Sequence, residues 1–296
     1  MKKNPFAMDQ GLLTAEELLY VEEKVLETFR YNLVGRNFYE VQSIGQGGGA
    51  QTYRWYDETD PSEAQISMTG KAQADDHPEK EAHDIDVPVI HKEFFLNWRD
   101  IASSRRVGPG LVDDCIRTAT WRVRDAEDKL LISGEHTGWA ALGLEGFFSA
   151  TGRTDNAASG NWPANAVADI NTARAALQAS GFVGIEPVLL GPPALIKCLD
   201  ALIANTGITY RTALLDNGLI SDAVETPNAF AEDGGVDSVV LIVPGNGNFV
   251  AVQDLPLEVH LWYDKSQNVY GTVRETIAPV IKRAAAIAEI NSITCA

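Results

Sequence analysis

The stretch from Gln51 to Ala82 places the strongest constraint on how this chain folds, because its sequence is that of an extended arm. It follows a glycine-rich segment, Gly45–Ala50, and begins with polar and aromatic side chains that alternate as in a strand, over residues 52–56. Its continuation is polar and holds few apolar side chains that could anchor it to its own core. An arm of this kind needs a neighbouring subunit to cover it. The sequence therefore predicts a long hairpin that contacts another copy of the chain.

Two segments carry the apolar periodicity of helices. Thr14–Asn32 opens with a capping box, Thr14 followed by Glu17, and then repeats apolar residues every three or four positions along one stripe. The longest helical pattern runs from Leu111 to Ser133, with apolar residues at positions 115, 119, 123, 126, 130 and 131. We expect this second helix to be the backbone of the subunit.

The remaining pattern mixes short strands with short helices. A strand is expected at Phe38–Ile44, and residues 89–101 are strand-like. Beyond Trp162 we expect helices at Ala164–Ala179 and Pro193–Asn205, and strands at Val188–Leu190, Val239–Val243, Phe249–Gln253 and Leu257–Trp262. This alternation predicts two α+β lobes that share one long helix.

Charge and hydropathy exclude several classes of protein. The formal net charge of -17 repels phosphate backbones, so direct binding of nucleic acid is not expected. Asp9 and Gln10 interrupt the apolar stretch that a signal peptide would need, and no run approaches the roughly 20 apolar residues of a membrane span. We therefore expect a cytoplasmic protein with no membrane partner.

The three cysteines, Cys115, Cys198 and Cys295, lie far apart in the sequence. They form no C-x-x-C pair and have no histidine at the spacing of a zinc ligand. We expect neither a disulfide framework nor a metal site, and we interpret all three as reduced thiols.

Motifs that would indicate catalysis are weak. Gly45–Ala50 matches the dinucleotide pattern G-x-G-x-x-A, but residues 51–55 alternate like a strand, so a flexible hinge is favoured over a nucleotide site. The acidic groups at 113–114 and at Asp125, Glu127 and Asp128 could be paired acid and base groups, but helical spacing places most of them on the solvated side of the long helix. The five histidines are scattered and match no nucleophile or HExxH signature. A nucleotide- or flavin-dependent enzyme is the rival class.

Collinear segments over nearly the whole chain, from about Leu12, resemble the encapsulin shell proteins, a linocin-like family. The segments are LVGRNFYEV (33–41), VPVIHKEFFLNWRDI (87–101), SSRRVGPGL (103–111), RDAEDKLLISG (124–134), GLEGFFSATGR (143–153), LQASGFVGIEPVLLGPPALIKCLDALIANTGI (177–208), QDLPLEVHLW (253–262) and VRETIAPVIKRAAAIAEI (273–290).

The resemblance implies an α+β fold of the Hong Kong 97-type phage capsid class, with a peripheral domain, an axial domain and an extended loop. The implied parts are an N-terminal helix with the start of the peripheral domain (1–50), the extended loop (51–86), the peripheral domain with the long helix (87–161), the axial domain (162–253) and a return to the peripheral domain with the C-terminus (254–296). The implied function is that of a structural subunit of an icosahedral shell around a cargo enzyme. A viral or proviral major capsid protein of the same fold is the alternative.

The resemblance also implies three functional surfaces. A terminal targeting peptide of the cargo would dock in a groove formed by Phe29, Leu33, Phe38, Leu257 and Val259, although the first three also suit packing within the subunit. A loop at a symmetry axis would line a pore with Ser180, Gly181, Phe182 and Glu186, and its carboxylates would favour cations. No cofactor is required. Trp98, next to Arg99, either packs in the subunit or an interface, or stacks a flavin as in some relatives.

Overall fold

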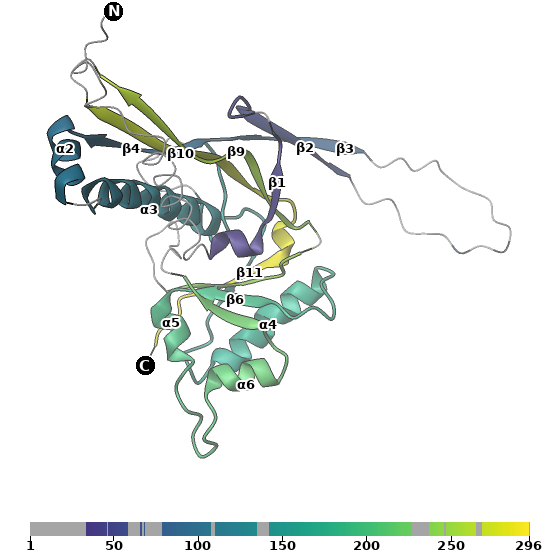
Figure 1. Ribbon diagram of the computed structural model, residues 1–296. Coiled ribbons are helices and arrows are strands. Elements are labelled where there is room, and N and C mark those ends of the chain that lie inside the picture. The colour runs from purple at the N-terminus through teal and green to yellow at the C-terminus, as the bar shows by residue number, and fades with distance from the viewer. Residues whose placement is uncertain are drawn as a thin grey trace, which may run out of the picture.

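The computed structural model describes residues 34–45, 47–58, 66, 68, 79–107, 110–134, 142–226, 237–245, 247–264 and 268–295. The expected N-terminal helix Thr14–Asn32, with Phe29 and Leu33, lies outside the described residues. Within them the chain forms two lobes and a projecting hairpin (Figure 1).

The peripheral lobe is a sheet with one long helix along it. Its four strands have the order β1 (Glu40–Ser43), β9 (Phe249–Tyr263), β10 (Val269–Ile281) and β4 (Val89–Leu96). Helix α3 (Gly110–Ser133) packs against β4 and β10, and α2 (Trp98–Val107) precedes it (Figure 1). The helix turns Ile116, Ala119 and Val123 toward Phe94, Leu257 and Val259 of the sheet. This apolar contact explains the expected periodicity of Leu111–Ser133.

The arm is a two-stranded ladder, which confirms the predicted hairpin. β2 (Thr52–Glu58) pairs antiparallel with β3 (Lys80–Asp86), from Thr52 opposite Asp86 to Glu58 opposite Lys80. Its base is anchored better than the sequence indicated, because side chains of both strands pack on the peripheral sheet. These contacts join Tyr53, Trp55 and Ile85 to Val250, Val252 and Val280. From this base the hairpin projects away from both lobes (Figure 1).

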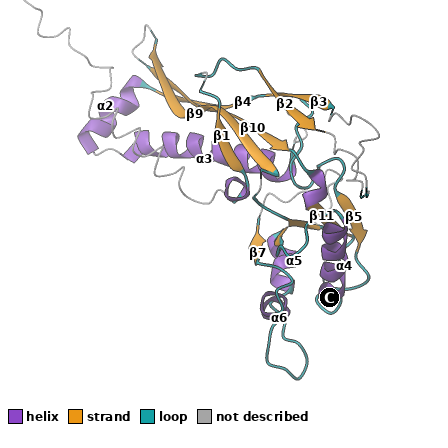
Figure 2. Ribbon diagram, turned by 90° about the vertical axis from the view of Figure 1, so that its right-hand side faces the viewer, coloured by secondary structure: helices purple, strands orange, loops and turns teal. Residues whose placement is uncertain are grey.

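The axial lobe is built on a second sheet. Its five strands have the order β5 (Thr154–Ala157), β11 (Ile287–Asn291), β8 (Val239–Ile242), β6 (Val188–Gly191) and β7 (Asp222–Glu225). Helices α4 (Ala166–Ala179), α5 (Pro193–Cys198) and α6 (Tyr210–Asp216) complete it, and α4 and α6 lie on the side away from the peripheral lobe (Figure 2). The sheet thus takes β5 and β11 from outside residues 162–253. Short 3-10 helices, η1 (Gly35–Phe38) and η2 (Ala284–Ala286), precede β1 and β11.

Several expected elements differ in extent for local reasons. The strand-like stretch 89–101 ends at Leu96, because the Asn97 side chain accepts a hydrogen bond from Arg99 N (2.9 Å) and so starts α2. The expected helix from Pro193 ends at Cys198. The chain after it turns back through a bridge between Leu202 and Thr209. The two strands expected at Phe249–Gln253 and Leu257–Trp262 are one continuous strand, β9, with a register shift against β10.

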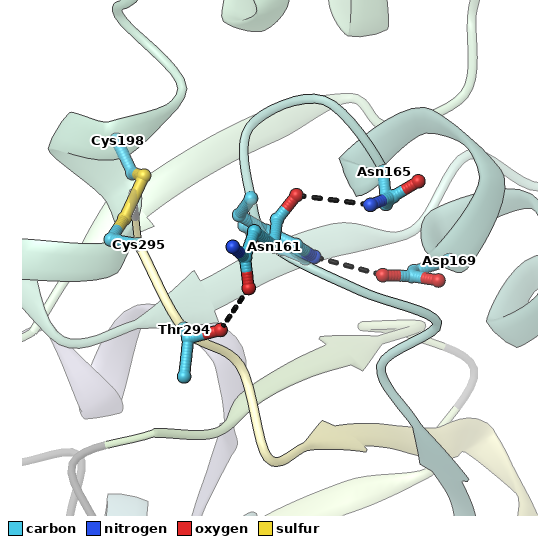
Figure 3. Close-up of a disulfide and its surroundings, with 7 residues drawn as sticks. Asn161, Asn165, Asp169, Cys198, Thr294 and Cys295 are labelled. Carbon is cyan, nitrogen blue, oxygen red and sulfur yellow. Dashed lines mark hydrogen bonds between the residues drawn. A yellow bond between two sulfur atoms is a disulfide. The ribbon is translucent and has the colours of Figure 1, made fainter.

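The prediction of three reduced thiols is wrong for two of them. Cys198 and Cys295 form a disulfide with a Cα–Cα distance of 6.3 Å, although 97 positions separate them in the sequence (Figure 3). The fold brings the end of α5 beside the C-terminal tail. The distance between two cysteines in the sequence does not predict whether the fold brings them together. Cys115 is free of a disulfide.

Candidate assembly surfaces, cargo groove and axial loop

The arm presents a ladder with one exposed face, and its other face, with Tyr53, Trp55 and Ile85, is half-buried on the peripheral sheet. Trp55 stacks on His83 at 4.4 Å between ring centroids, and Arg54 donates two hydrogen bonds of 2.6 Å to the Asp84 carboxylate. Beyond these pairs Tyr56 is exposed. A two-stranded ladder is marginally stable by itself in water. The geometry therefore suits an arm that gains its remaining contacts from a neighbour.

The predicted pore residues lie in the turn that links α4 to β6, which we call the axial loop (180–187). Gly181 and Gly184 have positive φ values of 97° and 78°, a conformation that favours glycine. Ser180, Gly181 and Glu186 are exposed, and Val183, which the sequence reasoning left out, is 72% exposed. Phe182 instead is 8% exposed and packs in the axial core. In this conformation Phe182 can therefore contribute its backbone to a pore, but its side chain cannot line one.

The described residues of the expected cargo groove fall into two clusters. Phe38, in η1, is half-buried and meets Phe147 edge-on at 6.5 Å between ring centroids. Leu257 and Val259 are also half-buried, but they pack beneath α3 with Ile116. The structure thus shows two half-buried apolar surfaces next to α3, and the groove that would join them stays a prediction.

Trp98 stands at the first position of α2 with 42% of its surface exposed. Its backbone N donates to Asn268 Oδ1 (3.1 Å), and the Arg99 guanidinium lies 5.7 Å from the centre of the indole ring. The sequence reasoning missed a row of three aromatic rings on the peripheral sheet. The Tyr270 ring on β10 lies 5.0 Å from the Phe95 ring on β4 and 5.9 Å from the Trp262 ring on β9, measured between ring centroids. The alternation of exposed side chains along these strands is the signal that could have indicated it.

The prediction that most acidic groups of the long helix face solvent is wrong for Glu127 and Asp128. Both are buried, because η1 and β10 cover this face of α3. Asp128 Oδ1 accepts hydrogen bonds from the backbone N of Val34 (3.1 Å) and of Gly35 (2.8 Å). These contacts fix the start of η1 on the long helix.

Glu127 belongs to a carboxylate cluster formed with Arg36 and Glu275. Arg36 Nε donates to Glu127 Oε1 (2.7 Å), Arg36 also pairs with Glu275, and Gln253 Nε2 donates to Glu275 Oε1 (2.7 Å). Burial, reinforced by the neighbouring Glu275 charge, raises the pKa of Glu127 to about 8, and burial also raises the pKa of Glu275. One arginine thus joins η1, α3 and β10 through two carboxyl groups that compete for its charge.

A long helix on a four-stranded sheet, a second lobe with its own sheet and a projecting hairpin define the shell-subunit class of phage-capsid folds. The chain belongs to the family described as encapsulating protein for peroxidase, whose model matches residues 7–276. It is 27% identical to the type 1 encapsulin shell protein EncA of Myxococcus xanthus (strain DK1622) over 226 residues, 76% of each chain.

Solved structures agree with this fold. The virus-like particle from Pyrococcus furiosus matches with a TM-score of 0.66 and 16% identity over 93% of this chain and all of that one. The capsid of Myoviridae phage XM1 gives the same TM-score at 12% identity over 86% and 90% of the two chains. The α+β capsid fold is therefore confirmed. The chain is a self-assembling shell subunit, and as a member of a structural family it is not an enzyme.

Two further observations concern other kinds of site. None of the helices in the described part of the chain is long and apolar enough to cross a membrane. Among the residues that the structure describes, no group of three or more His, Cys, Asp or Glu side chains is placed to hold a metal ion. The family description indicates no cofactor.

Proposed function

We propose that the shell formed by this chain is an icosahedral, cytoplasmic nanocompartment that encloses a cargo enzyme. The observation that carries the proposal is the family match over residues 7–276, because that family is described by its encapsulation of peroxidase. A peroxidase-type enzyme is accordingly the cargo class to test first. Likeness to the phage capsid does not decide between compartment and virus, because it reflects the fold alone.

Cargo would enter the shell through a terminal peptide that docks beside α3. The half-buried side chains of Phe38, Leu257 and Val259 supply apolar contact area next to that helix. A short extended peptide can bury its own apolar side chains on such surfaces. The test is co-expression of the shell with a peroxidase-type enzyme that carries a candidate terminal peptide, followed by isolation of particles.

The outcome is measured as cargo per shell. Particles that contain the enzyme only when the peptide is present support the proposal. Particles that contain the enzyme equally with and without the peptide contradict peptide docking. Particles that instead contain DNA would favour the viral alternative.

The axial loop would line a pore that admits small cations. Its exposed Glu186 carboxylate lies beside Gly218, where an added Cβ would be 3.0 Å from Glu186 Oε1. Repetition of Glu186 around a symmetry axis would form a ring of negative charge, which favours cations over anions. Entry of a cationic and an anionic dye into Glu186→Gln shells tests this, with Glu40→Gln as the control because Glu40 is an exposed carboxylate on the peripheral lobe. Unchanged cation preference in Glu186→Gln contradicts the pore.

A further inference from the structure

The disulfide between Cys198 and Cys295 lies at the surface of the axial lobe. Figure 3 shows the bridge between the two side chains. Cys295 is exposed and Cys198 is half-buried. Thiol–disulfide exchange requires that a small thiolate reach one of the two sulfur atoms, so exposure decides whether a bridge is fixed or exchangeable. The position of Cys295 gives small thiols access to this bridge.

On one side the disulfide ties down the C-terminal tail, residues 292–295. Ile293 is buried in the axial core, and its backbone N donates to Asp237 O (2.8 Å). After Ile293 the tail is held by Thr294, which accepts from Trp162 N (2.9 Å) through its carbonyl and donates to Asn161 Oδ1 (2.6 Å) through its hydroxyl. Thr294 is itself exposed. The disulfide is thus the covalent part of a polar attachment at the surface.

On its other side the disulfide holds the base of an exposed turn, which we call the tip hairpin (201–209). This hairpin follows α5, a helix of 6 residues, and the Ala201 backbone N donates to Cys198 O (3.3 Å). Its Leu202 and Ile208 are 66% and 45% exposed, and Leu202 bridges to Thr209. A helix this short has little stability of its own. A covalent link at its last residue therefore restricts the motion of the hairpin that follows.

We propose that Cys198 and Cys295 form a thiol–disulfide switch that controls how firmly the C-terminal tail and the tip hairpin are held on the axial lobe. A low-molecular-weight disulfide such as oxidised glutathione closes it. One cysteine thiolate attacks this disulfide and releases one glutathione thiolate, and the second cysteine thiolate then displaces the other. Two protein thiols are oxidised, their two protons pass to solvent or to the released thiolates, and one oxidant molecule is reduced to two thiols. Excess reduced glutathione reverses both steps.

The first test counts thiols in the assembled, full-length protein after equilibration at graded ratios of reduced to oxidised glutathione. Samples are quenched with acid and unfolded before the count. We expect one thiol per chain, that of Cys115, at the oxidising end and three at the reducing end, because the chain has three cysteines. The Cys115→Ser control should give none and two. A count that stays at three throughout, or at one throughout, contradicts a switch.

The second test measures amide hydrogen exchange of 292–295 and 199–209 in the same particles. Exchange of both segments should accelerate by about tenfold or more in the reduced state, because local opening sets exchange rates. Cys198→Ser should show the reduced behaviour at every glutathione ratio, and Cys115→Ser should match the unaltered protein. Equal exchange in oxidised and reduced unaltered protein would overturn the proposal, and that comparison needs no variant.

Discussion

Replacement of Glu127 by glutamine tests whether the buried carboxylate cluster holds an extra proton in the folded chain. Burial is the main cause that raises the pKa of Glu127 to about 8 from its ordinary value of 4.5. A carboxyl whose pKa rises on folding binds its proton more tightly in the folded state. Its contribution to stability is therefore fully present below pH 4.5 and is lost as the pH rises through about 8.

The size of this effect follows from the interval between the two pKa values. At about 1.4 kcal/mol per pH unit, the interval from 4.5 to about 8 corresponds to a loss of roughly 5 kcal/mol in the free energy of unfolding. Glutamine removes the titration while its amide oxygen still accepts from Arg36 and its amide nitrogen can donate to Glu275. Glu127→Gln should therefore be less sensitive to pH over this interval than the unaltered chain, and more stable than it near pH 9.

The assay is denaturant unfolding of the particles between pH 5 and pH 9, followed by tryptophan fluorescence. Asp125→Asn is the matched control, because Asp125 lies on the same helix but is only half-buried and pairs with Lys129 (2.7 Å) outside the cluster. This control should keep the pH dependence of the unaltered chain. The reasoning is refuted if Glu127→Gln keeps that dependence as well.

Three other predictions concern assembly and ligands. Deletion of 51–82 should prevent closed shells, because it removes strand β2 and most of the arm. Light scattering should then show small species only, and closed shells from the deleted chain would contradict the role of the arm. Phe38→Ala should give intact shells that bind the cargo peptide about 30-fold more weakly in Kd, or roughly 2 kcal/mol, as measured by titration of the peptide. Unchanged binding would show that Phe38 is not part of the groove. Failure to assemble would show that Phe38 is needed for packing on Phe147. If Trp98 stacks a flavin, shells incubated with riboflavin phosphate and then desalted should keep the visible absorbance bands of flavin, and Trp98→Ala shells should lose them; equal spectra would contradict the site.

The parts of the fold that the sequence predicted are those whose signal is local. The long helix, expected at Leu111–Ser133, spans Gly110–Ser133, because its apolar residues repeat wherever α3 meets the sheet. The hairpin of the arm was also predictable from the alternation at 52–56. Both patterns reflect the conformation of one contiguous segment.

The features that were missed depend on contacts between distant segments. Helical spacing placed most acidic groups of α3 on its outer face, but the environment of Glu127 is set by two distant residues. Arg36 lies 91 positions before it, and Glu275 lies far after it in the chain. Likewise, Phe182 follows α4 in a glycine-rich turn that looks exposed, yet its ring enters the core beside the axial sheet. Periodicity shows which side of an element is apolar, and it does not show what later segments will cover.

The same limit applied to the cysteines. Cys198 and Cys295 carry no spacing motif, and only the return of β11 into the axial sheet brings the tail to α5. The resemblance to encapsulin shells supplied the capsid fold, which the family match and the solved structures confirm.

Electron microscopy of the chain purified alone, with its mass in solution measured at micromolar concentration, tests the central claim most directly. A self-assembling shell subunit should form closed, hollow particles of megadalton mass without cargo or nucleic acid, because an arm of this kind and the capsid fold both need neighbours of the same sequence. A chain that remains a monomer or a small oligomer under these conditions would contradict the account.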